Sequence, residues 1–181
     1  MKRLYAFDFD GTLTTADTLL VFIRYACGTW RFIVGFLLHS PLLVLMKLKL
    51  YPNYRAKQRI FAWYFRGMEL KTFDALCRQF AERNVCLIRP KAKALLERLF
   101  IEGESVCVVS ASIDNWVRPF FTNMATNSRS NFCVLGTQVE ADDNGLLTGR
   151  FLTNNCYGAE KVERRCMQVR YLTVHRNGYV I

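Results

Sequence analysis

The chain has 181 residues, enough for one domain with an insertion and a substantial apolar interior. Hydrophobic residues make up 51% of it and charged residues 22%, which excludes an intrinsically disordered protein. The formal net charge of +10 favours anionic partners, whether phosphorylated small molecules, anionic lipid surfaces or nucleic acid, and does not choose among them.

The first predicted element is a short buried strand. Residues 4–7 are apolar and are followed by Asp8-Phe9-Asp10-Gly11, a pattern typical of a strand that ends in a turn. Because Asp8 and Asp10 interrupt the apolar run so early, no secretory signal peptide is visible. We therefore expect a cytoplasmic protein.

Helices are predicted for the next part of the chain. Asp17 is expected to cap a helix over residues 18–26 that ends at Gly28. Further helical stretches are expected at 30–50, 54–65 and 70–83, with breaks at Pro41, Pro52 and Gly67. The most apolar window, 32–46, is interrupted by His39-Ser40-Pro41 and falls short of the roughly 20 residues that a spanning helix needs, so we do not expect it to span a membrane.

Strands and helices alternate in the rest of the chain. We predict a helix over 90–100, a strand over 105–109, a helix from 113, a strand over 132–135, a hairpin around 142–145, a helix over 157–169 and a strand starting at 179. This alternation predicts an α/β fold with a Rossmann-like parallel sheet, whose ligands bind beyond the carboxyl ends of the strands. Residues 1–15 and 87–181 would form the core, and residues 16–86 a helical cap.

The carboxylate pair at the first strand's end suggests magnesium-assisted chemistry. Two carboxylates two residues apart repel each other unless a cation lies near them. Mg²⁺ prefers oxygen ligands and keeps several waters, so one carboxylate, a backbone carbonyl and a substrate phosphate can form much of its shell. Asp8 can then attack phosphorus, while Asp10 protonates the leaving oxygen and later activates water. Gly11 permits a tight turn that exposes backbone N–H groups to phosphate oxygens.

Three segments resemble the motifs of haloacid dehalogenase-like (HAD) phosphatases. Asp8 to Thr14, DFDGTLT, is similar to the first motif. Val108 to Ser112 is similar to the second, in which the Ser110 hydroxyl and the amide of Ala111 would hold the phosphoryl group. The seven residues that end at Lys161 are similar to the third, in which that lysine neutralises the phosphorylated intermediate. The order of the motifs and the helical insertion resemble the branch with phosphoserine phosphatases and bacterial phosphatidylglycerophosphatases.

The resemblance implies a Mg²⁺-dependent phosphate monoester hydrolase with a C1-type cap that works through an aspartyl-phosphate. Asp8 and Asp10 would be both catalytic and metal-binding residues, and Gly11 would bind phosphate. Thr12 would either donate to the phosphate or cap the turn. Asp17 occupies the position of an acidic residue that meets the substrate ammonium in phosphoserine phosphatases, or it only caps its helix.

The family's fourth motif, a Gly-Asp followed by a further Asp, would complete the magnesium shell. This sequence ends at Tyr179-Val180-Ile181, where the strand that carries it would start. We expect either a truncated version of a longer protein or an incomplete metal site. The alternative function is therefore a catalytically incomplete relative that binds phosphate or a membrane surface.

The cap sequence is one-sided in charge. Residues 18–68 contain no Asp or Glu and the following eight cations: Arg24, Arg31, Lys47, Lys49, Arg55, Lys57, Arg59 and Arg66. Either the cap has a basic rim that attracts a soluble phosphorylated molecule, or it lies peripherally on the anionic inner face of the membrane and admits a lipid phosphate. No nucleic-acid recognition motif is present. The seven cysteines form no C-x-x-C pair, which indicates reduced, core-filling thiols.

Overall fold

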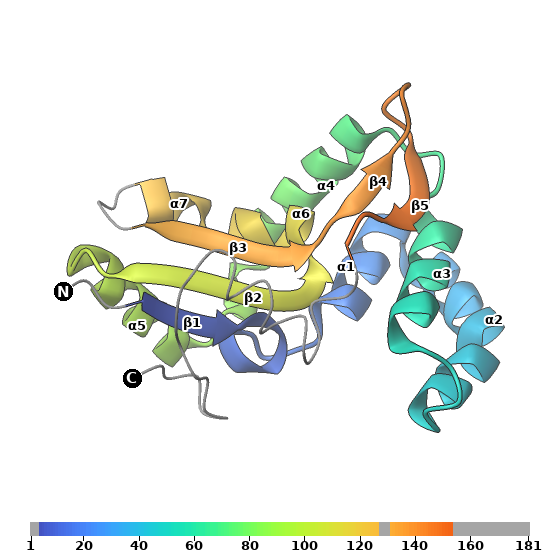
Figure 1. Ribbon diagram of the computed structural model, residues 1–181, viewed down its shortest axis with the longest axis horizontal. Helices are drawn as coiled ribbons and strands as arrows, with labels where there is room; N and C mark the ends of the chain where they lie inside the picture. The colour runs from blue at the N-terminus through green and yellow to red at the C-terminus, as the bar shows by residue number, and fades with distance from the viewer. Residues whose placement is uncertain (1–3, 127–130, 154–181) are drawn as a thin grey trace.

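The computed structural model of the protein describes residues 4–126 and 131–153. Within these residues, three parallel strands form a sheet in the order β1 (Leu4–Asp8), β2 (Ser105–Ile113) and β3 (Phe132–Thr137) (Figure 1). Asp8 is paired with Val109, the middle residue of β2, so the turn after β1 starts beside the second half of that strand. The predicted α/β fold with a parallel sheet is confirmed.

Apolar side chains of the strands themselves and of the helix that precedes β2 hold the sheet in place. Residues 106–109 of β2 are all buried, as are Ala6 and Phe7 of β1. Helix α5 starts at Pro90, whose missing N–H needs no partner in a first helical turn, and packs Leu96 and Leu99 into the core. Burial on this scale is the main stabilising contribution to the sheet.

The helices follow the predicted order. They are α1 (Thr18–Cys27), α2 (Thr29–Lys47), α3 (Asn53–Phe65), α4 (Leu70–Arg83), α5 (Pro90–Ile101), α6 (Asp114–Val117) and α7 (Thr122–Thr126), with the short turns η1 (Phe9–Leu13), η2 (Val85–Leu87) and η3 (Arg118–Phe121). In Figure 1, α1, α2 and α3 lie beyond the arrowheads of the sheet, where ligands of parallel sheets bind.

An aromatic cluster joins helices of the predicted cap to α6, the helix that follows β2. The ring of Phe22 stacks on Trp116, with centroids 4.7 Å apart, and contacts Phe73 and Phe80 edge-on. Such pairs contribute about 0.5–1.5 kcal/mol each beyond their buried area. These contacts tie α1 and α4 to α6, so the division into a cap of 16–86 and a core stays a prediction.

Helix α2 runs through Pro41, and the predicted break at His39-Ser40-Pro41 is wrong. Proline has no N–H, so the carbonyl of Leu37, four residues earlier, loses its helical partner. Ser40 Oγ donates to that carbonyl at 2.8 Å instead. A local side-chain hydrogen bond thus allows one helix of 19 residues.

By length and apolar composition, α2 is the one helix in the described part of the chain that could cross a membrane. Only 6% of its apolar window is buried. Signal sequences and core helices of soluble proteins pass the same two criteria, so these properties alone assign no span.

A two-stranded hairpin lies beside α3. Strands β4 (Val139–Ala141) and β5 (Leu147–Phe151) are antiparallel and are joined by the turn predicted at 142–145. Gly145 has φ +75°, the left-handed conformation that glycine tolerates best. Phe151 packs on Phe61 of α3 with centroids 5.4 Å apart. The predicted helix at 157–169, the strand at 179–181 and Lys161 lie outside the described residues.

The described cysteines carry free thiols, but the prediction that they fill the core holds only for Cys77 and Cys107, and Cys86 is exposed. The described cysteines are Cys27, Cys77, Cys86, Cys107 and Cys133. Burial raises the pKa of the Cys77 thiol, which disfavours its reactive thiolate.

Candidate active site

Asp8 is the last residue of β1, where the sheet delivers it to the carboxyl edge. The chain then makes the tight turn η1, in which Gly11 has φ +76°. Phe9 fixes this turn to the core, because its fully buried ring contacts Phe120 and Phe121. The side chain of Asp8 is only half-buried, so it remains within reach of a ligand.

Thr14 is fully buried, and its side chain stabilises the turn through hydrogen bonds. Its Oγ1 lies 2.8 Å from the carbonyl of Ala16 and accepts from the N–H of Gly11 at 3.2 Å. The turn was expected to expose backbone N–H groups to phosphate, but the Gly11 N–H is directed at Thr14 here. The phosphate-binding role of Gly11 stays a prediction, as does that of the half-buried Thr12.

Arg89 also stabilises this turn, through three hydrogen bonds to its carbonyl groups. Its Nε donates to the carbonyl of Thr14 at 3.0 Å, and its Nη2 donates to that of Gly11 at 3.3 Å. Its backbone N–H also donates to Leu13 at 2.9 Å. Arg89 was not predicted as part of the site, because nothing in the local sequence marks a residue about 75 positions away as part of the turn.

The carboxylate of Asp10 is the centre of the site. Its Oδ1 accepts from the Thr18 hydroxyl at 2.6 Å and from the Thr18 backbone N–H at 2.8 Å. Its Oδ2 accepts from the Ser112 hydroxyl at 2.6 Å and lies 3.4 Å from Ser110 Oγ. Three segments, the turn after β1, the start of α1 and the end of β2, therefore meet on one carboxylate.

Further hydrogen bonds fix the positions of Thr18 and Ser112. Trp116 Nε1 donates to Thr18 Oγ1 at 3.3 Å, and the Ser112 N–H donates to Ser110 Oγ at 2.9 Å. Hydrogen bonds to a carboxylate are about twice as strong as neutral ones, so the position of Asp10 is well determined. Thr18, Ser112 and Trp116 were not predicted as site residues, although Ser112 belongs to the segment that suggested the second motif.

The Ser110–Ser112 segment lies within β2, not in a turn after it. The pairing of β2 with β3 shifts register between Val109 and Ile113, which marks an irregular strand end. Ser110 is fully buried there, and the carbonyl of Ala111 accepts from Thr137 Oγ1 at 3.2 Å. Their phosphate-binding roles stay predictions, and Lys161 lies outside the described residues.

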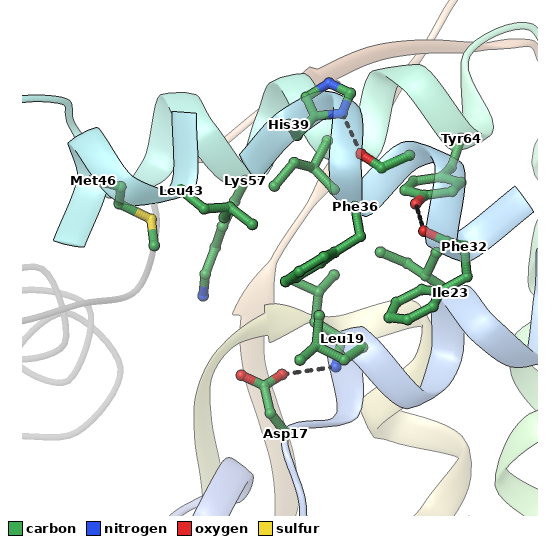
Figure 2. Close-up of a pocket in the computed structure, with 13 residues that line it drawn as sticks. Asp17, Leu19, Ile23, Phe32, Phe36, His39, Leu43, Met46, Lys57 and Tyr64 are labelled. Atoms are coloured by element: carbon green, nitrogen blue, oxygen red, sulfur yellow. Dashed lines mark hydrogen bonds between the residues drawn. The ribbon is translucent and has the colours of Figure 1, made fainter. Parts of the chain in front are cut away.

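Asp17 caps α1, as the sequence predicted. Its Oδ1 accepts from the backbone N–H of Leu19 at 3.0 Å. The same side chain lines a cavity of about 210 Å³ between α1, α2 and α3 (Figure 2). Both roles weighed for Asp17, helix cap and substrate contact, are compatible with this position.

The described residues contain no cluster of three or more His, Cys, Asp or Glu side chains that could hold a metal ion. Asp8 and Asp10 are the acidic residues in the segment from the end of β1 through the turn η1. A cation at this edge would therefore need main-chain, water or substrate oxygens as well, which suits Mg²⁺ better than a metal that prefers a full set of side-chain ligands.

Comparison with known proteins places the chain among hydrolases. The family model for haloacid dehalogenase-like hydrolases matches residues 5–177. Protein CicA of Caulobacter vibrioides is 32% identical over 165 residues, which cover 89% of this chain and 70% of CicA.

Solved structures share the fold at low identity. A protein of unknown function from Bordetella pertussis Tohama I has a TM-score of 0.73 at 16% identity, over 93% of this chain and 75% of that one. A phosphoserine phosphohydrolase-like protein from Francisella tularensis has 0.62 at 14%, over 94% and 74%. Phosphoserine phosphatase from T. onnurineus has 0.54 at 19%, over 91% and 70%. At these identities the likeness concerns the fold.

Proposed function

Because the chain belongs to the haloacid dehalogenase-like hydrolases, we propose that it is a Mg²⁺-dependent phosphate monoester hydrolase that uses Asp8 as nucleophile. The observation that carries the proposal is the carboxylate of Asp10, which Thr18 and Ser112 orient two residues beyond Asp8. A general acid needs a fixed position, and a carboxylate held by donors from both α1 and β2 has one. The substrate is a phosphorylated small molecule or a lipid phosphate.

In the proposed reaction, a carboxylate oxygen of Asp8 attacks phosphorus while the bond between phosphorus and the ester oxygen breaks. Asp10 in its acid form gives its proton to that oxygen, so the alcohol leaves. Water then attacks phosphorus and loses a proton to Asp10, and the bond to Asp8 breaks to release inorganic phosphate. Splitting the reaction into two displacements lowers each barrier.

The donor set at the sheet edge fits Mg²⁺. Asp8 would supply a carboxylate oxygen, and Asp10 its main-chain carbonyl, because its side-chain oxygens already accept from protein donors. When bound, the ion would supply positive charge against the phosphate oxygens. Ser110, the amide of Ala111 and Lys161 are proposed to hold the phosphoryl group.

Asp8→Asn is the decisive test. In the presence of Mg²⁺, the variant should lose p-nitrophenyl phosphate turnover by at least about 1000-fold, because an amide is no nucleophile. The thermal midpoint should barely change, and the exposed Asp143→Asn should keep full turnover as a matched control. Substantial metal-dependent turnover by Asp8→Asn would contradict the proposal. A wild-type chain that binds phosphate but hydrolyses nothing would favour the non-catalytic alternative.

We further propose that α2 rests on an anionic membrane surface. This helix lies at the outer edge of the molecule in Figure 1 and exposes the following apolar side chains: Trp30, Ile33, Val34, Phe36, Leu37, Leu38, Val44 and Leu45. Exposed cations flank them, namely Arg31, Lys47, Lys49, Arg55 and Arg59. Each Lys or Arg near an anionic surface contributes about 1 kcal/mol. Exposed apolar area bounded by cations supports a membrane partner over a soluble one.

Vesicle co-sedimentation tests this second proposal. The protein should bind anionic vesicles at low salt, bind less as salt rises, and bind neutral vesicles poorly. The double change Leu37→Glu with Leu38→Glu should abolish binding, whereas Ile101→Glu, at an exposed position on α5, should not. A protein that stays in the supernatant with anionic vesicles at low salt would leave a soluble substrate as the better interpretation.

A further inference from the structure

A cavity of about 210 Å³ lies inside the cap between α1, α2 and α3 (Figure 2). Its wall is formed mainly by apolar side chains, among them Leu19, Ile23, Phe32, Phe36, Leu43 and Ile60. We propose that this cavity binds the apolar group of the substrate, which is therefore an amphiphilic phosphate monoester. The assignment rests on the proposed function for the phosphate end of that molecule.

The polar side chains in the upper wall are turned toward the backbone. Tyr64 Oη donates to the carbonyl of Phe32 at 3.0 Å, and His39 Nδ1 lies 2.8 Å from the carbonyl of Gly35. In Figure 2, both interactions lie at the end of the cavity away from Asp17. The cavity interior is thus left apolar, which favours an apolar occupant over a polar one.

The charged side chains lie at the opposite end, which faces the active site. Lys57 extends from α3 toward the level of Leu19 and Asp17 in Figure 2. Lys57 and Leu19 also line a narrow cleft of about 10 Å³, whose other lining residues include Ala111 and Ser112. Ser112 is the residue that donates to Asp10, so the cleft adjoins the site of the proposed chemistry.

This arrangement matches a molecule with an anionic end and an apolar end. The phosphate would lie at the carboxyl edge of the sheet, with the Lys57 ammonium at the junction and the apolar group in the cavity. The cleft has room for about one water molecule, so it shows where the cavity and the active site come close together and is too small to hold a head group.

The size of the cavity sets the length of the group. An apolar cavity of about 150 Å³ can hold benzene, so this one holds roughly six to eight carbons. Leu20 and Phe36 line the cavity and are 42% and 44% exposed, so one wall opens outward. A longer alkyl chain can extend out of the cavity on that side. Both a soluble alkyl phosphate and a lipid phosphate can therefore place an apolar chain in the cavity.

The test uses the full chain and non-hydrolysable methyl-, butyl- and octylphosphonate, with binding measured by calorimetry below the micelle concentration. Affinity should rise about fourfold per methylene until the cavity is filled. Leu43→Trp and Ile60→Trp fill the cavity and should flatten this dependence, whereas Ile101→Trp, on the exposed end of α5, should keep it. Thermal melting of each variant checks that it is folded.

Binding and turnover separate the two proposals. Chain-length-dependent binding without hydrolysis of the corresponding alkyl phosphates would support the cavity and overturn the hydrolase. Hydrolysis of methyl phosphate as efficient as that of octyl phosphate, with equal phosphonate affinities, would overturn the cavity and leave the hydrolase standing. Adding short-chain phosphatidic acid distinguishes the sources, since a cavity that selects lipids should prefer it to octyl phosphate.

Discussion

Ser112 Oγ donates to Asp10 Oδ2 at 2.6 Å, although the two residues are 102 positions apart in the chain. The contact exists because β1 and β2 are adjacent parallel strands and end at the same edge. It joins the first two motifs of the site into one structure.

Ser112→Ala should weaken both activity and stability. Loss of a hydrogen bond to a charged group costs about 1.5 kcal/mol of unfolding free energy, since Thr18 still holds Asp10. We expect kcat to fall about 10- to 100-fold with little change in KM, because Asp10 is misplaced in the proton transfer. Ser105→Ala, at the other end of β2, is the control and should match the wild type. Equal losses in both variants would argue against an orienting role for Ser112.

Metal removal should abolish turnover. Dialysis against a chelator is expected to lower hydrolysis of p-nitrophenyl phosphate at least about 100-fold, and added Mg²⁺ should restore it. Ca²⁺ should restore it poorly, because its longer bonds and larger shell do not suit a site with one side-chain carboxylate. Full activity after exhaustive chelation would exclude a metal-dependent mechanism.

Gly35→Ala should destabilise the cap. A Cβ at Gly35 would clash with Tyr64 Oη and would lie 2.6 Å from the Trp63 ring, so these side chains or the helices α2 and α3 would have to shift. Overpacking costs about 1–3 kcal/mol, which exceeds the roughly 1 kcal/mol that alanine gains over glycine in a helix. Thermal melting measures the loss, and Val34→Ala on the exposed face of α2 is the control. An unchanged or higher midpoint for Gly35→Ala would mean that the two helices are not in close contact.

Asp114 should make stability depend on pH. Burial raises the pKa of its carboxyl, a shift that Asp74 reinforces and Arg118, 3.6 Å away, only partly offsets. The folded state therefore favours the protonated form, so unfolding free energy falls as pH rises from the ordinary carboxyl range through the raised pKa. Asp114→Asn should remove this decrease in urea titrations across that range. The exposed Asp143→Asn should retain it, and a pH dependence unaltered by Asp114→Asn would assign it to other groups.

Short-range sequence patterns were sufficient to predict most of the helices, strands and turns. Alternating strands and helices, the cap at Asp17, Pro90 in a first helical turn and the turn at 142–145 were all predicted and are present. These features depend on residues within a few positions of each other. The break predicted at Pro41 failed because Ser40 supplies the hydrogen bond that proline cannot. A prediction of helix breaks from proline alone does not take the Ser40 side chain into account.

The sequence by itself determined where the two carboxylates lie, at the end of a buried strand, and which segments resemble family motifs. Only the tertiary structure decided which groups meet them. Thr18 and Ser112 reach Asp10, and Arg89 reaches the turn at Gly11, through strand register and helix placement. The apolar cavity likewise appears only when three helices are packed together, because its volume depends on how side chains from different helices fit and not on the order of residues within any one of them.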